Sequence, residues 1–186
     1  MKYTQQEKLQ ILMLCDIYRA LGIKHSYDPE IIEDAITSDN YWAIDWEYQH
    51  LYSGNETPKE VSFFVDVYDM YKILNETYMK LSPEDKADVA AQVQFFNEEY
   101  SLEFPGFDGN NEGEYMSIGR MLQKMGRFSG SEDLTKNSHS EKVGAYRRML
   151  EVFLPARKDA WNHTRGITKE SLIATLNSEF SHYRSE

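Results

Sequence analysis

The sequence has a single cysteine, five prolines and no long hydrophobic run, and these shortages exclude several classes of protein. Cys15 has no partner for an internal disulfide, and no CxxC pair for zinc occurs. Cys15 lies in the apolar run 12–15, which predicts a buried, inert thiol. No run approaches the roughly 20 apolar residues that span a bilayer, and the N-terminus lacks the apolar stretch of a signal peptide. We therefore expect a cytoplasmic protein that does not contact membranes.

The motifs of catalysis and of cofactor binding are missing as well. The sequence contains no Ser-His-Asp signature, P-loop, Gly-rich dinucleotide fingerprint or metalloprotease motif. We therefore predict no cofactor, and the missing motifs favour a protein that is not an enzyme. What is present is 41% apolar residues and 13 tyrosines, which indicates a globular protein with many half-buried amphipathic positions.

Helix start and stop signals predict an all-α protein, a single domain over residues 1–186 with about seven to eight helices. N-capping residues and N-terminal prolines predict helix starts, which are near Thr4, Asp28, Thr57, Ser82, Asn110 and Thr168. The helix over 58–80 is apolar almost all round, so we place it at the centre of the core. Its few polar residues form a narrow stripe that we expect to be solvated: Ser62, Asp66, Asp69, Lys72 and Glu76.

Three further boundaries follow from local composition. The helix that opens at Ser82 is expected to continue towards Tyr100. Residues 129–141, rich in Ser, Asn and charge, predict an exposed loop. A helix that begins near Val143 is expected to be broken by Pro155.

The net charge of −11 is unevenly distributed along the chain. Residues 1–105 carry 20 acidic residues against 8 basic ones, and residues 106–186 carry 11 against 12. The acidic part repels nucleic acid, so any phosphate contact belongs to the second part. The asymmetry equally allows one part of a protomer to meet the other part of a neighbour, as in a homo-oligomer.

The basic residues of the second part form a weak candidate for anion binding. Helical spacing places three of the five on one stripe, and the set is Arg120, Lys124, Arg127, Arg147 and Arg148. The alternative is an ordinary solvated face. Arg157 and His163 have a spacing that resembles that of HEPN-class ribonucleases, although an exposed pair is the simpler interpretation. His139 is a second histidine that such an enzyme could use.

Three patterns imitate metal sites without completing one. Two Glu-x-x-His pairs, Glu47 with His50 and Glu179 with His182, have the spacing used by di-metal carboxylate proteins. The stretch 108–113 imitates the start of a calcium loop, but its twelfth position is Gly119 instead of a bidentate Glu. We predict no metal, and we expect Asp108 or Asn110 to cap the following helix.

An aromatic segment over 41–52 is the other candidate site. Trp42 and Trp46 are one helical turn apart, and Tyr48 follows them. Such a cluster is core in most proteins, and where it is exposed it supplies the residue types that anchor protein interfaces. Both interpretations remain open, and we take the three residues as a candidate interface.

The order of several motifs resembles the YfbU family of bacterial proteins. The motifs are Gly106-Phe107-Asp108 with the helix through Tyr115, the later Tyr146-Arg147-Arg148-Met149-Leu150, and the stretch 66–71 of the central helix. The resemblance covers residues 8–176. It implies a small, helical, cytosolic protein, and it transfers no catalytic residue because the family has no established reaction.

These observations favour a non-enzymatic interaction or regulatory module that self-associates. The alternative is an enzyme or binding protein that acts on RNA or another phosphate-bearing ligand through the basic second half. Nucleic acid is therefore a possible partner that the acidic charge disfavours.

Overall fold

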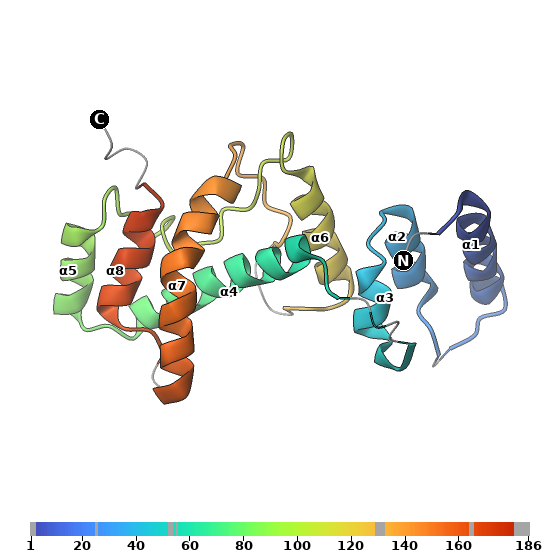
Figure 1. Ribbon diagram of the computed structural model, residues 1–186, viewed down its shortest axis with the longest axis horizontal. Coiled ribbons are helices and arrows are strands. Elements are labelled where there is room, and N and C mark those ends of the chain that lie inside the picture. Colours follow the sequence, from blue (N-terminus) through green and yellow to red (C-terminus); the bar gives the residue numbers. More distant parts are fainter. Residues whose placement is uncertain are drawn as a thin grey trace. The chain divides into compact units, whose positions relative to one another are not determined.

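The structure is a computed structural model that describes residues 3–24, 26–51, 54, 56–128, 133–163 and 166–180, without the side chains of 161–163. Within these ranges the regular structure is all-α, as predicted, and the only β-pairing is an isolated bridge between Phe107 and Asn137. The helices, drawn in Figure 1, are α1 (Gln5–Ala20), α2 (Pro29–Thr37), α3 (Trp42–Glu47), η1 (Gln49–Leu51), α4 (Lys59–Met79), α5 (Pro83–Gln92), α6 (Gly113–Lys124), α7 (Val143–His163) and α8 (Lys169–Ser178). Over the described ranges, no helix has the length and apolar character needed to cross a bilayer.

The chain folds into two compact units. The first, Met1–Ser62 with Glu114–Thr135, holds α1, α2, α3, η1 and nearly all of α6. The second, Phe63–Gly113 with Lys136–Glu186, holds most of α4 together with α5, α7 and α8. A single domain over 1–186 stays a prediction.

The predicted capping residues open four of the helices. The Asp28 carboxylate accepts from the backbone N–H of Glu30 at 2.8 Å, and the hydroxyls of Ser82 and Thr168 each accept an N–H three residues on at 3.1 Å. At Thr4 the capping box is complete, because the Glu7 carboxylate returns a bond to the Thr4 N–H. Each cap satisfies a donor that the first helical turn leaves without an intrahelical partner.

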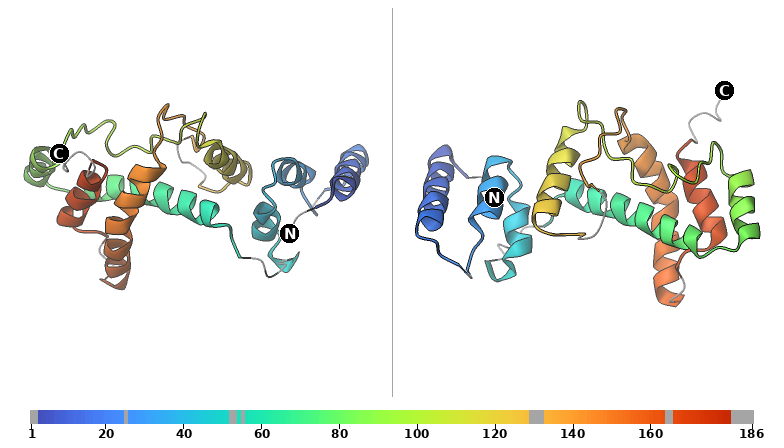
Figure 2. Two further views of the ribbon diagram at one scale, coloured as in Figure 1. Left: turned by 45° about the horizontal axis from the view of Figure 1, so that its top comes forward. Right: turned by 180° about the vertical axis from the view of Figure 1, so that it is seen from behind.

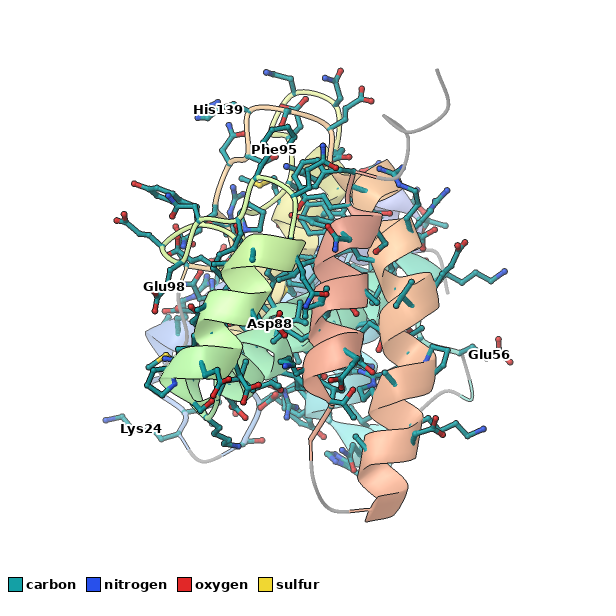
Figure 3. All side chains as sticks on the ribbon, turned by 90° about the vertical axis from the view of Figure 1, so that its left-hand side faces the viewer. Lys24, Glu56, Asp88, Phe95, Glu98 and His139 are labelled. Atoms are coloured by element: carbon teal, nitrogen blue, oxygen red, sulfur yellow. The ribbon has the colours of Figure 1, made fainter. Side chains whose placement is uncertain are left out.

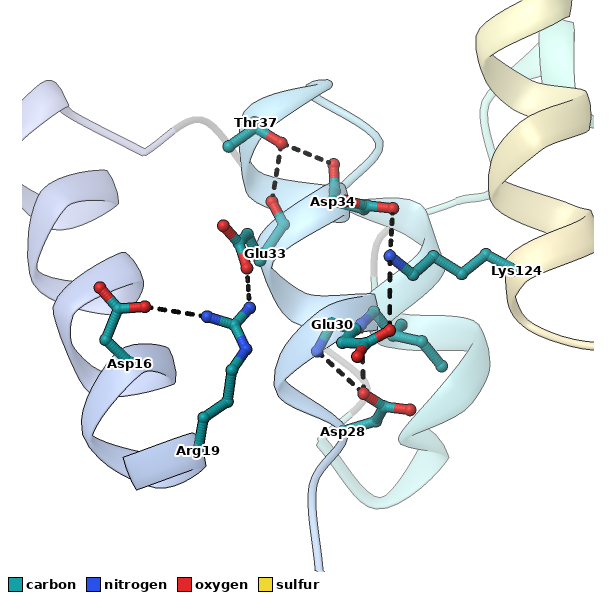
Figure 4. Close-up of polar contacts among 9 residues, drawn as sticks. Asp16, Arg19, Asp28, Glu30, Glu33, Asp34, Thr37 and Lys124 are labelled. Atoms are coloured by element: carbon teal, nitrogen blue, oxygen red, sulfur yellow. Dashed lines mark hydrogen bonds and ion pairs between the residues drawn. The ribbon is translucent and has the colours of Figure 1, made fainter. Parts of the chain in front are cut away.

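In the first unit, α2 packs against both α1 and α3 (Figures 1 and 2). The α2 residues Ile31, Ala35 and Ile36 are buried. Ion pairs join the neighbouring helices: Arg19 of α1 contacts Glu33, and Lys124 of α6 lies 2.6 Å from Asp34 (Figure 4). The polar face of α2 is thus held on two sides.

In the second unit, α4 is the central buried helix, as predicted. Its side chains Phe64, Val67, Met70 and Leu74 have no exposed surface. The helices α7 and α8 pack side by side, and α5 lies against α8 (Figures 1 and 2).

The prediction for α5 was wrong at its C-terminal end. The helix stops at Gln92, and the chain then turns through Val93, which is buried, and Phe95, which has a φ of 56° (Figure 3). Asn177 of α8 explains the stop: its side chain accepts from the N–H of Gln94 at 3.0 Å and donates to the carbonyl of Gln92 at 3.0 Å. A residue more than 80 positions away therefore ends the helix.

Pro155 does not break α7, which continues through it to His163. The ring removes one backbone hydrogen bond, but the following turn is held by Arg157, whose guanidinium lies 2.8 Å from Asp66 of α4. The same contact corrects the expectation of a solvated stripe on α4, because Asp66 is half-buried and ion-paired.

The predicted loop over 129–141 is only partly exposed. Residues 129–132 lie outside the described ranges. Farther along, Leu134 is 2% exposed, and Asn137 pairs with Phe107. The loop is therefore anchored in the structure at two points.

Candidate functional site

Gly106, Phe107 and Tyr146, from two of the motifs that carry the family resemblance, meet at a buried junction in the second unit. Gly106 has a φ of 88°, and a Cβ there would lie 1.9 Å from the carbonyl oxygen of Lys136, so only glycine fits. The Tyr146 hydroxyl donates to the Gly106 carbonyl at 2.6 Å. Phe107 is 1% exposed, with its ring centroid 5.3 Å from that of Tyr146. These residues thus hold the fold together.

Glu112 completes the junction. Its buried carboxylate accepts three backbone N–H groups: those of Asp108 at 3.0 Å, Lys142 at 2.8 Å and Val143 at 2.7 Å. Two of these donors precede or begin α7, so the carboxylate also lies at the positive end of that helix dipole. We predicted that Asp108 or Asn110 caps the following helix, but α6 begins only at Gly113, and the Asp108 carboxylate instead accepts the N–H of Asn110 at 3.2 Å in the turn before it. Backbone N–H groups and the Asn111 side-chain amide therefore occupy the oxygens of Asp108 and Glu112 that a calcium ion would need.

Two buried tyrosines make the second unit sensitive to alkaline pH. Burial raises the pKa of Tyr71, and it also raises the pKa of Tyr146 far above the ordinary value of about 10. A raised folded-state pKa contributes stability that is complete below about pH 10 and is lost above it. We expect the free energy of unfolding to fall by about 1.4 kcal/mol per pH unit for each tyrosine above pH 10.

Urea denaturation at three values between about pH 9 and 11 measures this slope. Tyr71→Phe should roughly halve it, since the Tyr71 hydroxyl contacts only the Met149 sulfur, at 3.9 Å, among its described contacts. Tyr100→Phe is the matched control, because Tyr100 is 64% exposed. A free energy that stays constant up to pH 11 would contradict the burial of these phenols.

The residues of the two Glu-x-x-His pairs, which imitate a metal site, contact other protein groups where the structure describes them. Glu47 pairs with Arg127 at 3.4 Å, and His50 lies 3.3 Å from the Tyr27 hydroxyl. Glu179 pairs with Lys142 at 3.2 Å, while His182 lies outside the described residues. Over the ranges that the structure describes, no three His, Cys, Asp or Glu residues are grouped so as to hold a metal ion.

The candidate anion-binding residues are divided between the two units. Lys124 and Arg127 contact carboxylates of the first unit. In the second unit, Arg148 donates to the carbonyls of Ser178 at 3.3 Å and Glu179 at 2.7 Å, and so caps the end of α8. Arg120 and Arg147 are exposed. Three of the five side chains thus have structural partners, and binding of phosphate stays a prediction.

The structure describes one of the two side chains in the Arg157 and His163 pair. Arg157 is bound to Asp66 of α4, and the side chain of His163 lies outside the described part of the chain. The other histidine, His139, is exposed, and its backbone N–H donates to the Asn137 side chain at 2.9 Å.

The aromatic segment forms part of the wall of a cavity in the first unit. Trp42 is 7% exposed and its ring centroid lies 5.2 Å from that of Trp46, with the planes at 77°. The cavity has a volume of about 540 Å³ and is lined by Trp42, Asp45, Trp46, Gln49, Glu56, Thr57 and Arg127. Two of the predicted interface residues and one of the predicted anion ligands therefore meet at this cavity.

Tyr48 follows the cavity residues closely in the sequence, but its side chain contacts the segment just before α2. Its hydroxyl accepts the Asp28 N–H at 2.7 Å, before α2. Burial raises the pKa of Tyr48, and the hydrogen bond from Asp28 opposes that rise. The tyrosine thus secures the start of a helix.

The first helix, α1, presents an exposed apolar face that none of the sequence motifs predicted. Cys15 is buried as predicted, and burial raises its thiol pKa, but five apolar side chains near it are between 52% and 70% exposed: Leu9, Met13, Leu14, Ile17 and Leu21. At 100° per residue these five span about 140° of the helix circumference. The sequence does carry a signal for this face. The segment that forms α1 has more apolar residues than its packing contact with α2 can bury.

Over the described residues the fold defines an all-helical protein. Its sequence matches the model of the YfbU domain over residues 1–168, and the chain belongs to the YfbU family. The UPF0304 protein MJECS11 of Methanocaldococcus jannaschii is similar to it, with 30% identity over 182 residues that cover 92% of this chain and 98% of that protein.

Proposed function

We propose that this protein is a non-catalytic interaction module that self-associates through the apolar face of α1. The observation that carries the proposal is the exposure of that face, from 52% at Ile17 to 70% at Leu21. An exposed, contiguous apolar patch on a folded protein is the usual mark of an interaction site. This replaces the aromatic segment as the candidate interface, because Trp42 is internal to the first unit.

The charge of α1 favours a second copy of this chain as the partner. Between Gln6 and Leu21 the exposed arc carries apolar residues, glutamine and alanine, while the charged residues of the helix lie at its edges or on the opposite side. Two copies with a net charge of −11 repel each other, and an uncharged face is the surface where that repulsion is smallest. The same net charge disfavours an anionic membrane or a nucleic acid.

The size of the face sets the expected affinity. A helix of 16 residues is about 24 Å long, and stable interfaces bury roughly 800 Å² per partner from 20 or more residues. Contacts from α1 alone fall below that size, so we expect a dimer that depends on concentration. Antiparallel pairing about residue 15 places Met13 of one helix against Ile17 of the other and makes the face self-complementary.

Sedimentation between about 1 and 100 µM tests the proposal. We expect the wild-type mass to rise from 21.8 kDa towards twice that value. Ile17→Lys or Met13→Lys should keep the protein at 21.8 kDa throughout, because each places a charge at the centre of the pair. Met79→Lys is the matched control, since Met79 is 64% exposed at the end of α4. Circular dichroism should show unchanged helix content in every variant.

The salt dependence separates this interface from one built on charge asymmetry. Association through an apolar face should hold or strengthen as ionic strength rises from about 0.05 to 0.5 M, because salt screens the repulsion between copies. Pairing of acidic with basic surfaces would weaken over the same range. A monomer at every concentration and salt level would refute self-association.

A further inference from the structure

The cavity beside α3 has the size and the walls of a small-molecule site. Its volume of about 540 Å³ falls within the range of roughly 300–1,000 Å³ that is typical of ligand pockets. The described lining residues all belong to the first unit. We propose that this cavity binds a small organic cation, of the substituted ammonium class, with an apolar body.

The aromatic walls supply the first reason. The rings of Trp42 and Trp46 meet nearly at a right angle and so form a corner. Each indole N–H is already used: that of Trp42 donates to the Asn40 side chain at 3.0 Å, and that of Trp46 donates to Thr57 at 3.0 Å. The rings are held in place by these bonds. Trp46 is the less buried of the two and offers most of the π-surface that a ligand can reach, with Trp42 behind it. An organic cation is attracted more strongly to an indole ring than to the rings of Tyr or Phe.

The charge of the lining supplies the second reason. Two carboxylates, Asp45 and Glu56, line the cavity, with Glu56 on the exposed segment before α4 (Figure 3). Arg127, the one cation among the described residues of the lining, donates to the Trp46 carbonyl at 3.2 Å and pairs with Glu47 at 3.4 Å. The guanidinium charge is thus partly offset by a carboxylate outside the lining, and the site as a whole prefers a positive ligand to a phosphate.

A bare divalent metal fits these walls poorly. Calcium takes 6–8 oxygen ligands, whereas two indole rings occupy much of this wall. An ammonium group with alkyl substituents suits both the carboxylates and the indole rings of this wall. Its positive charge is attracted to the carboxylates, and its alkyl groups pack on the rings.

Calorimetric titration with choline tests the inference, and 3,3-dimethylbutan-1-ol is the matched probe because a carbon atom replaces the charged nitrogen. We expect choline to bind with a Kd below about 10 mM, and the neutral analogue about 5- to 30-fold more weakly. Glu56→Gln and Trp46→Leu should each weaken choline binding by about fivefold or more. Glu99→Gln and Tyr100→Leu, which change exposed residues outside the cavity, should leave it unchanged.

Glu56→Gln keeps the test decisive if Trp46→Leu disturbs the fold, because Glu56 is exposed. Equal affinity for the two probes, tighter binding of inorganic phosphate, or no choline binding up to about 10 mM would each overturn the proposal. Choline binding by Ile17→Lys should equal that of the wild type, so the cavity can be tested whether or not the protein self-associates.

Discussion

Phe64→Ala is expected to destabilise the second unit by about 3–5 kcal/mol, a large part of the stability of an ordinary domain. Phe64 has no exposed surface and lies on the buried face of α4. Its ring centroid is 5.4 Å from that of Phe107 and 5.9 Å from that of Phe104. Truncation removes these contacts and leaves a cavity that the surrounding rings can fill only in part.

Urea denaturation followed by circular dichroism gives the free energy of unfolding. Phe95→Ala is the matched control, because Phe95 is 76% exposed and its truncation should cost no more than about 0.5 kcal/mol. Equal stability of the two variants would show that α4 is not the centre of the core.

Glu112→Ala should have an effect of similar size for a different reason. The substitution leaves the backbone N–H groups of Asp108, Lys142 and Val143 without their acceptor. Each buried donor without a partner costs about 1–3 kcal/mol, and the helix dipole of α7 loses a favourable charge. We expect a total loss of about 3–6 kcal/mol.

Two variants give this experiment its controls. Glu112→Gln retains one acceptor oxygen and should show an intermediate loss. Glu114→Ala changes an exposed carboxylate two residues on and should stay within about 0.5 kcal/mol of the wild type. A melting temperature unchanged in Glu112→Ala would show that water satisfies these donors and that the junction is not essential to the fold.

The sequence predicted the features that depend on neighbours along the chain. Capping residues, proline at the first helical position and hydrophobic periodicity act within one or two turns, and so Asp28, Ser82 and Thr168 open helices in the structure as expected. The central position of α4 followed in the same way, from an apolar circumference that only burial could satisfy.

The candidate sites were predicted less completely, because their roles depend on contacts between distant residues. The basic residues Lys124, Arg127 and Arg148 looked available for a ligand, yet each contacts an oxygen at least 30 positions away. Trp42 and Trp46 were recognised as unusual, but the cavity that they line also needs Glu56 and Arg127. No pattern of neighbouring residues in the sequence indicates that these distant side chains line the same cavity.

What this sequence determined by itself is therefore the helical class, the starts of its helices and the core position of α4, since short-range sterics and hydrogen bonding decide these. The tertiary structure decided where α5 ends, through Asn177, and why α7 passes Pro155, through the Arg157–Asp66 pair. It also decided which apolar face of α1 is covered and which remains exposed. The physical reason is common to all three: a distant side chain changes the local balance of hydrogen bonding or burial, and its position exists only once the chain has folded.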